Sequence, residues 1–149
     1  MVEWKFEQRP AGNSLAPIVG ARPGMTEARQ NLGKSGEDLA ATELVSRGYA
    51  IVDRRYRTTH GEIDIIARDG ETMVFVEVRR RSSGEFGTAA ESVTPAKQRR
   101  VIRMAIAYLS LQGLYDRCPV RFDVVGIDDL PDGTPRITVY PGAFDDTRR

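Results

Sequence analysis

The alternation of hydrophobic and polar residues along this chain is clearest over residues 61–81. Two runs rich in β-branched and aromatic residues flank Asp69-Gly70, a dipeptide that is typical of tight hairpin turns. We therefore predict two antiparallel strands joined by this turn. Counting outward from the turn gives a register with the facing pairs Arg68–Glu71, Ile66–Met73, Asp64–Phe75 and Glu62–Glu77.

Acidic residues interrupt the apolar pattern of both predicted strands. Asp64 lies in the middle of the first run and Glu77 near the end of the second, although strand interiors are depleted in acids. The period of two places both carboxylates on one face as diagonal neighbours, within reach of each other. We expect the same face to carry Glu62, Ile66, Met73, Phe75 and Arg79, and the opposite, apolar face to carry Ile63, Ile65, Ala67, Val74, Val76 and Val78.

A helix is predicted before the hairpin, beginning at residues 32–35 and ending at Gly48, which suits the C′ position. Glu37 falls on the apolar stripe of this helix, where a lone carboxylate is costly to bury. It therefore needs a bound cation, a cap interaction in the first helical turn or an arginine partner, and the sequence leaves these open. The stripe itself consists of Ala40, Ala41, Leu44 and Val45.

A second helix is predicted from Thr94-Pro95, a suitable N-cap followed by a proline at the first helical position, to about Gly113. Gln98 lies at the N-terminal end of its inner stripe of Val101, Ile102, Ala105, Ile106 and Leu109. Positive side chains in the first turns oppose the helix dipole, so a phosphate partner explains them better than a solvated face. These basic residues are Lys97, Arg99, Arg100 and Arg103.

Three more strands are predicted, over residues 49–56, 120–127 and 137–140, the last at a sheet edge. A Gly- and Ser-containing loop over 82–92 is long enough to be mobile beside the acidic face. Asp123 is expected to pair with Arg121 or with a helix arginine. The order αβββαβ(β) predicts an α/β fold, with a mixed sheet of four to five strands flanked by helices.

The predicted domain covers residues 31–141. Residues 1–30 contain three prolines and no sustained periodicity, so we expect a flexible N-terminal extension, and residues 142–149 are expected to form a C-terminal tail. The length of 149 residues suits one domain with a real core, and 40% hydrophobic and 29% charged residues are ordinary for a globular protein.

Charge is unevenly distributed although the formal net charge is only +1. Residues 62–77 have a net charge of −4 and residues 79–103 a net charge of +5. An acidic hairpin beside a basic surface suits a cation-dependent site that acts on a polyanion, while solvated helix faces are the plainer explanation.

Several kinds of site are disfavoured by single residues. Cys118 is the only cysteine, so an internal disulfide and a cysteine-based zinc site are excluded, and a reducing cytoplasm is expected. His60 is the only histidine; we expect it in a loop, and no nucleophile motif surrounds it. No apolar run approaches the length of a membrane span, so no membrane partner is expected.

Four short motifs occur in a fixed order: Gly36-Glu37, Gly61-Glu62-Ile63-Asp64, Phe75-Val76-Glu77-Val78-Arg79 and Arg121-Phe122-Asp123-Val124. In this order and spacing they resemble the YraN-like family of uncharacterised bacterial proteins. That family is similar to the archaeal Holliday-junction resolvases of the restriction-endonuclease-like superfamily. The resemblance covers about residues 26–127 and implies a restriction-endonuclease-like fold.

The resemblance also implies a set of site residues. The superfamily pattern is a helix Glu, a strand Asp and a Glu-x-Lys on the next strand, often with a Gln or Lys from the following helix. Arg79 stands where the lysine is usual; it keeps the charge and can clamp a phosphate, but it does not deprotonate. Carried over, the catalytic positions are Glu37, Asp64, Glu77, Arg79 and Gln98, with Lys97 as the alternative to Gln98.

These residues lead us to expect a nuclease-like, nucleic-acid-binding domain, a candidate Mg²⁺-dependent endonuclease on DNA, branched DNA included. Mg²⁺ or Mn²⁺ would be held by Asp64 and Glu77 with the Val78 carbonyl. Two alternatives stay open. One is a non-catalytic nucleic-acid-binding or protein-interaction module with a relic acidic site, and the other is a set of acids that only form buried ion pairs with Arg55, Arg79 or Gln98 and bind nothing. Resolvases are two-fold dimers, so a homodimer is also an option. Nucleic-acid contacts are expected from Arg80, Arg81, Lys97, Arg99, Arg100 and Arg103.

Overall fold

The two helices begin and end where local chemistry requires it. In the computed structural model, which describes residues 35–146, the Ser35 hydroxyl accepts a hydrogen bond from the Asp38 amide and caps the first helix. Thr94 caps the second helix in the same way, with Pro95 at its first position. Gly48 follows the first helix with a φ of +91°, as predicted for a C′ glycine.

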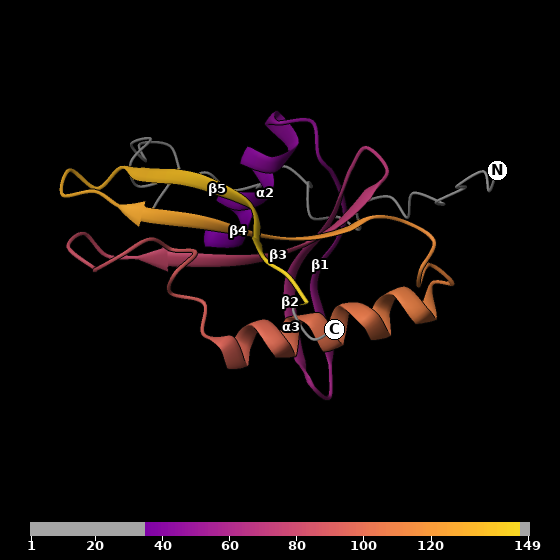
Figure 1. Cartoon of the computed structure of the whole chain (residues 1–149). Coiled ribbons are helices and arrows are strands. Elements are labelled where there is room, and N and C mark those ends of the chain that lie inside the picture. The colour runs from indigo at the N-terminus through magenta and orange to yellow at the C-terminus, as the bar shows by residue number, and fades with distance from the viewer. Residues whose placement is uncertain (1–34, 147–149) are drawn as a thin grey trace.

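These helices cover opposite faces of a five-stranded mixed sheet, with α2 on one side and α3 on the other (Figure 1). The strand order is β1-β2-β3-β4-β5; β3 and β4 are parallel and the other neighbours are antiparallel. The α/β, restriction-endonuclease-like fold class is thereby confirmed. The elements are α2 (Gly36–Ser46), β1 (Ala50–Thr58), β2 (Gly61–Asp69), β3 (Thr72–Arg81), α3 (Pro95–Leu111), β4 (Val120–Asp129) and β5 (Pro135–Phe144).

Of the two predicted domain boundaries, only the C-terminal one lies within the described residues. Strand β5 continues to Phe144, beyond residue 141. The N-terminal extension expected at 1–30 lies outside the described residues. Within residues 35–146, neither helix has the length and apolarity needed to cross a membrane.

Both faces of the central strands are buried, in two separate cores. On the α3 side, Phe75 packs edge-on against Tyr108, with ring centroids 5.8 Å apart. The expected face of Ile66, Met73 and Phe75 is therefore a core and is not open to solvent. The α3-side core also contains Ile63, Val101 and Leu109, and the α2-side core contains Leu44, Ile65, Ala67, Val74, Val76 and Val125.

The predicted apolar stripe of the first helix was partly wrong. Val45 is exposed, whereas Leu39, which lies outside the predicted stripe, is buried. The helix is therefore rotated towards Leu39 relative to the prediction. Ala40 and Leu44 lie at the centre of the buried face, as expected.

The predicted register of the β2–β3 hairpin was wrong by two residues. Asp69 pairs with Thr72, so the turn consists of Gly70-Glu71, and Gly70 supplies the positive φ (+60°) that this tight turn needs. A shift by two keeps every side chain on its face, so the hydrophobic pattern cannot distinguish the two registers. Continuing the observed pairing places Asp64 directly opposite Glu77.

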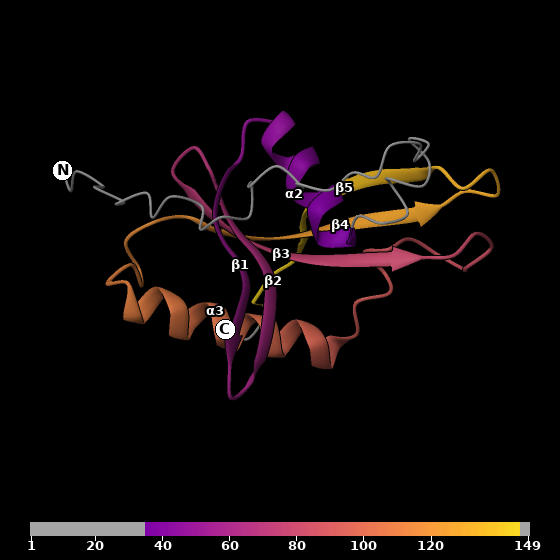
Figure 2. The same cartoon turned by 180° about the vertical axis from the view of Figure 1, so that it is seen from behind.

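Strands β2 and β3 separate where Asp64 and Glu77 would pair. Their ladder ends at Ile65↔Val76, while β2 stays paired with β1 to Thr58↔Gly61 and β3 stays paired with β4 to Arg81↔Asp128. Figure 2 shows the β1–β2 hairpin leaving the β3–β5 arm at this fork. The assignment of Ile63 to the face of Ile65 was wrong, because β2 twists at the fork and Ile63 joins the α3-side core.

The loop after β3 is anchored to the sheet, although it was expected to be mobile. Ala89 and Val93 are buried against Val124 of β4. Ala89 packs so closely on Gly126 that a Cβ added at Gly126 would lie 2.5 Å from the Ala89 Cβ. The loop therefore holds a defined position beside the fork.

Candidate metal and nucleic-acid site

Asp64 takes the place of a missing backbone partner at the fork. Its Oδ2 atom accepts a hydrogen bond of 2.8 Å from the Val78 amide of β3. A buried amide needs such a partner, and here a side chain supplies it where the ladder between β2 and β3 has ended. The carbonyl of Val78, predicted as a metal ligand, is not placed against Asp64 by this contact and stays a prediction.

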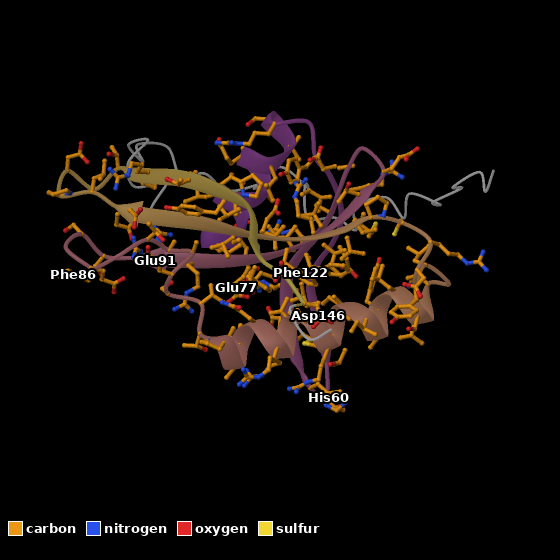
Figure 3. The ribbon with its side chains drawn as sticks, in the orientation of Figure 1. His60, Glu77, Phe86, Glu91, Phe122 and Asp146 are labelled. Atoms are coloured by element: carbon orange, nitrogen blue, oxygen red, sulfur yellow. The ribbon has the colours of Figure 1, made fainter. Side chains whose placement is uncertain are left out.

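Glu77 is the most deeply buried acid of the site, with a side chain only 5% exposed. Figure 3 shows it between the sheet and helix α3. Its Oε1 atom lies 3.5 Å from the Lys97 Nζ atom, whereas Oε2 is buried and has no hydrogen-bond partner among the described residues. Burial, and then the neighbouring Asp64 carboxylate, raise the pKa of Glu77 to about 7. Burial also raises the pKa of Asp64, against the effect of the Val78 amide.

Two further carboxylates lie close to Asp64. Oxygen atoms of Glu37, Glu62 and Asp64 are all within 4.8 Å of one another, so helix α2 and strand β2 form one acidic cluster. We call these three residues the outer cluster. Asp64 connects it to Glu77, and the four acids together surround the fork in the sheet.

Glu37 and Glu62 are each paired with an arginine of β1. The Arg55 Nε atom lies 2.5 Å from Glu37 Oε2, and the Arg57 Nε atom lies 2.8 Å from Glu62 Oε2. Of the options that the sequence left open for Glu37, the structure shows the arginine partner, and a bound cation stays a prediction. Hydrogen bonding to Glu37 also raises the pKa of Arg55, which stays protonated.

Glu62 was missed as a site residue, whereas Arg55 was expected only as an ion-pair partner of the acids, and it does pair with Glu37. Glu62 precedes Asp64 by two, and the period of two in a strand already placed both on one face. Arg55 has a φ of +52° inside strand β1. A non-glycine residue in this region of φ is uncommon, and here it accompanies a side chain that reaches the helix acid.

The two remaining predicted catalytic residues contact the anchored loop. The Arg79 Nε atom donates to Ser92 Oγ at 3.2 Å, and the Gln98 amide donates to the Val93 carbonyl at 3.0 Å. Of the two helix candidates, Lys97 is therefore the one that contacts Glu77. Arg79 lies two residues from Glu77 on β3, as the predicted face requires.

The predicted nucleic-acid contacts divide into two groups. Arg80 and Arg81 are paired with Asp129 and Asp128 at the far end of β3. In contrast, the α3 residues Arg99, Arg100 and Arg103 are exposed, and the described residues offer none of them an ion pair. These three residues form what we call the basic face of α3.

Asp123 has the structural role that was expected for it. It is fully buried and accepts hydrogen bonds from Arg121, from the Tyr49 hydroxyl and from the Gly142 amide. Burial and the Asp123 charge raise the pKa of Tyr49 to about 12. His60 lies in the exposed turn between β1 and β2, as predicted.

Comparison with known proteins finds close relatives without a described activity. Residues 36–127 match the model of "Uncharacterised protein family UPF0102". The chain is 45% identical to a UPF0102 protein of Anaeromyxobacter dehalogenans over 86% of this chain and 94% of that protein. It is 52% identical to one of Chlorobium chlorochromatii over 65% of this chain and 74% of that protein. A third, from Symbiobacterium thermophilum, is 45% identical over 77% and 97%.

Proposed function

The chain belongs to the uncharacterised protein family UPF0102, and from the geometry of its fork we propose that it is a metal-dependent nuclease-type domain that binds DNA. One observation carries the proposal: among residues 35–146, a buried carboxylate oxygen of Glu77 has no hydrogen-bond partner, and Glu77 borders the Asp64 carboxylate. Leaving such an oxygen unpaired is costly. A bound cation between the two acids would remove that cost.

The ligand atoms offered at the fork fit a hard divalent cation. They are carboxylate oxygens from Asp64 and Glu77, with Glu37 and Glu62 nearby, and this donor set suits Mg²⁺ or Mn²⁺. In the proposal Asp64 and Glu77 hold the ion, with the Val78 carbonyl as a third ligand. When bound, such an ion polarises a phosphodiester and lowers the pKa of a coordinated water.

Two basic side chains beside Glu77 have different chemical capacities. Arg79 has a planar guanidinium, so its proposed role is to bind a phosphate oxygen. Lys97, at 3.5 Å from Glu77, has a compact ammonium group. Lys97 thus brings to the fork the lysine side chain that is absent at position 79.

The basic face of α3 would position the nucleic-acid backbone. Arg99, Arg100 and Arg103 are exposed on the helix whose N-terminal turn carries Lys97. Contacts of this kind are to phosphates, so binding is expected to be salt-sensitive and largely independent of sequence. DNA is the proposed polymer, and a branched substrate or a homodimer are finer forms of the proposal.

A non-catalytic nucleic-acid-binding module is the second candidate. Arg55 and Arg57 neutralise Glu37 and Glu62 within the protein, so two of the four acids need no ion to be stable in the fold. The presence of Arg79 in place of the usual lysine also favours a non-catalytic module. Cleavage and binding therefore have to be measured side by side.

The test incubates purified protein with Mg²⁺ or Mn²⁺ and linear duplex, single-stranded or four-way-junction DNA, with Asp64→Ala as the inactive control. We expect cleavage of at least one substrate by the wild type and of none by the variant. Binding without cleavage of any substrate would favour the non-catalytic module.

A second pair of variants addresses the basic face of α3. Arg100→Glu combined with Arg103→Glu should weaken DNA binding at low salt. The same reversal at Arg47, an exposed arginine of the α2 C-cap, should not. Unchanged affinity of the double variant would remove α3 from the interface.

A further inference from the structure

Two arginines of strand β1 share an arrangement that the proposed function does not use. Arg55 and Arg57 each bind one acid of the outer cluster through Nε, and their side chains are 53% and 70% exposed. The acids they bind are more buried, at 18% for Glu37 and 30% for Glu62. Each arginine thus covers a carboxylate from the solvent side.

The pairing and the backbone geometry of β1 bring both arginines to the acids. Arg57 pairs directly with Glu62 across the β1–β2 ladder, and the pairs on either side place Arg55 opposite Asp64. At that point Arg55 takes its φ of +52°, and its side chain reaches Glu37 of the covering helix. Both arginines therefore contact the edge of the acidic site.

The acids of the outer cluster have reason to bind a cation in addition to their arginines. The side chain of Glu77 is only 5% exposed, and its Oε2 atom has no hydrogen-bond partner within the described part of the chain. Glu77 lies next to Asp64, which belongs to the cluster. A divalent ion bound at Asp64 would also meet the carboxylates of Glu37 and Glu62, because oxygen atoms of these three residues lie within 4.8 Å of one another. It would compete for those two carboxylates with the guanidinium groups of Arg55 and Arg57. Exposed ion pairs of this kind are individually weak, so such competition is feasible.

We propose an exchange of partners at this site: the divalent cation held by Asp64 and Glu77 also takes the carboxylates of Glu37 and Glu62, and the freed Arg55 and Arg57 bind the phosphate backbone. The inference rests on the proposed function and assigns two nucleic-acid contacts that the sequence did not indicate. By linkage, metal and nucleic acid then strengthen each other's binding. Without the ion, both arginines stay on the acids and contribute little to nucleic-acid binding.

The first arm of the test measures Mn²⁺ binding to the full chain by calorimetry. Arg55→Gln with Arg57→Gln should tighten Mn²⁺ binding about two- to tenfold, because the competing guanidinium groups are gone. Arg57→Gln alone, which leaves the unusual backbone of Arg55 untouched, should give part of this gain. Arg47→Gln, which breaks an exposed pair with Glu43 outside the cluster, should give none. Equal Mn²⁺ affinities in all four proteins would overturn the exchange.

The second arm measures binding of a labelled phosphorothioate duplex, which resists cleavage, as a function of NaCl concentration. Without Mn²⁺, the slopes of log affinity against log salt should coincide for the wild type and the double Gln variant. With Mn²⁺, the wild-type slope should be steeper by about 1 to 2, one phosphate contact contributing about 0.9. The charge-retaining pair Arg55→Lys and Arg57→Lys should recover most of this difference.

The outcomes separate this inference from the proposed function. Slopes that coincide with Mn²⁺, or that already differ without it, overturn the exchange while nucleic-acid binding stands. A wild-type protein that binds no nucleic acid in either condition overturns the proposed function together with the exchange.

Discussion

Glu77 should make the protein less stable as the pH rises, and Glu77→Gln should remove that effect. The folded-state pKa of Glu77 is raised from 4.5 to about 7 by burial and by Asp64. The native state therefore holds this proton more tightly than the unfolded chain does. The contribution of this carboxyl to the free energy of unfolding is fully present below pH 4.5 and is lost as the pH rises towards 7 and above.

The size of the effect follows from the shift. A difference of about 2.5 pKa units corresponds to about 3 kcal/mol, since each unit is worth about 1.4 kcal/mol. About 2 kcal/mol of this falls between pH 5 and pH 7. The Gln side chain has nearly the same shape and no titration, so the variant should gain on the wild type by that amount over the same interval.

Urea unfolding at a series of pH values, in metal-free buffer, measures this difference. Subtracting the wild-type curve from the variant curve removes the titrations that both proteins share. Glu71→Gln, at the exposed turn of the same hairpin, is the matched control and should give a curve parallel to that of the wild type. Parallel curves for Glu77→Gln as well would refute the idea that an uncompensated carboxylate is buried at the fork.

Three further substitutions test other parts of the structure. Gly126→Ala should destabilise the fold by about 1–3 kcal/mol in urea unfolding, because the new methyl group meets Ala89; an unchanged midpoint would contradict the close packing of the loop. Asp123→Ala should lower the free energy of unfolding by about 1–3 kcal/mol, because the Tyr49 hydroxyl and the Gly142 amide lose a buried acceptor while Arg121 keeps Asp69; an unchanged free energy of unfolding would argue against this network. Lys97→Met should lower stability at pH 8 more than at pH 5, because it removes the positive charge that lowers the pKa of the buried glutamate; an equal effect at both pH values would mean that the ammonium does not act on it.

The order of elements could be predicted because its signals are local. Thr94 and Pro95 mark a helix start through a hydroxyl cap and a fixed φ, and Gly48 marks a helix end through its positive φ. Such signals act over a few residues and do not depend on the rest of the fold. The alternation along β2 and β3 likewise placed Asp64 and Glu77 together before any pairing was known.

The details that failed depend on contacts between distant parts of the chain. Ile63 and Ile65 are two residues apart, so the alternation of a strand places them on one face. They nevertheless join different cores, because β2 twists where it leaves β3. Gln98 and Lys97 are adjacent on α3, and the way the helix rests on the sheet decides which of them reaches Glu77. The hydrophobic pattern predicts neither the core that Ile63 joins nor the α3 residue that contacts Glu77.

The irregular backbone of β1 also bears on aggregation between copies of this protein. β1 is an edge strand, and a long flat edge would invite another chain to add a strand and so start aggregation. The ladder register shifts between Ile51 and Asp53, and Arg55 departs from extended geometry soon after. Together with the charges of Arg55 and Arg57, these breaks make the edge a poor template for a further strand. The residues that cover the acids therefore also help to keep the protein from aggregating.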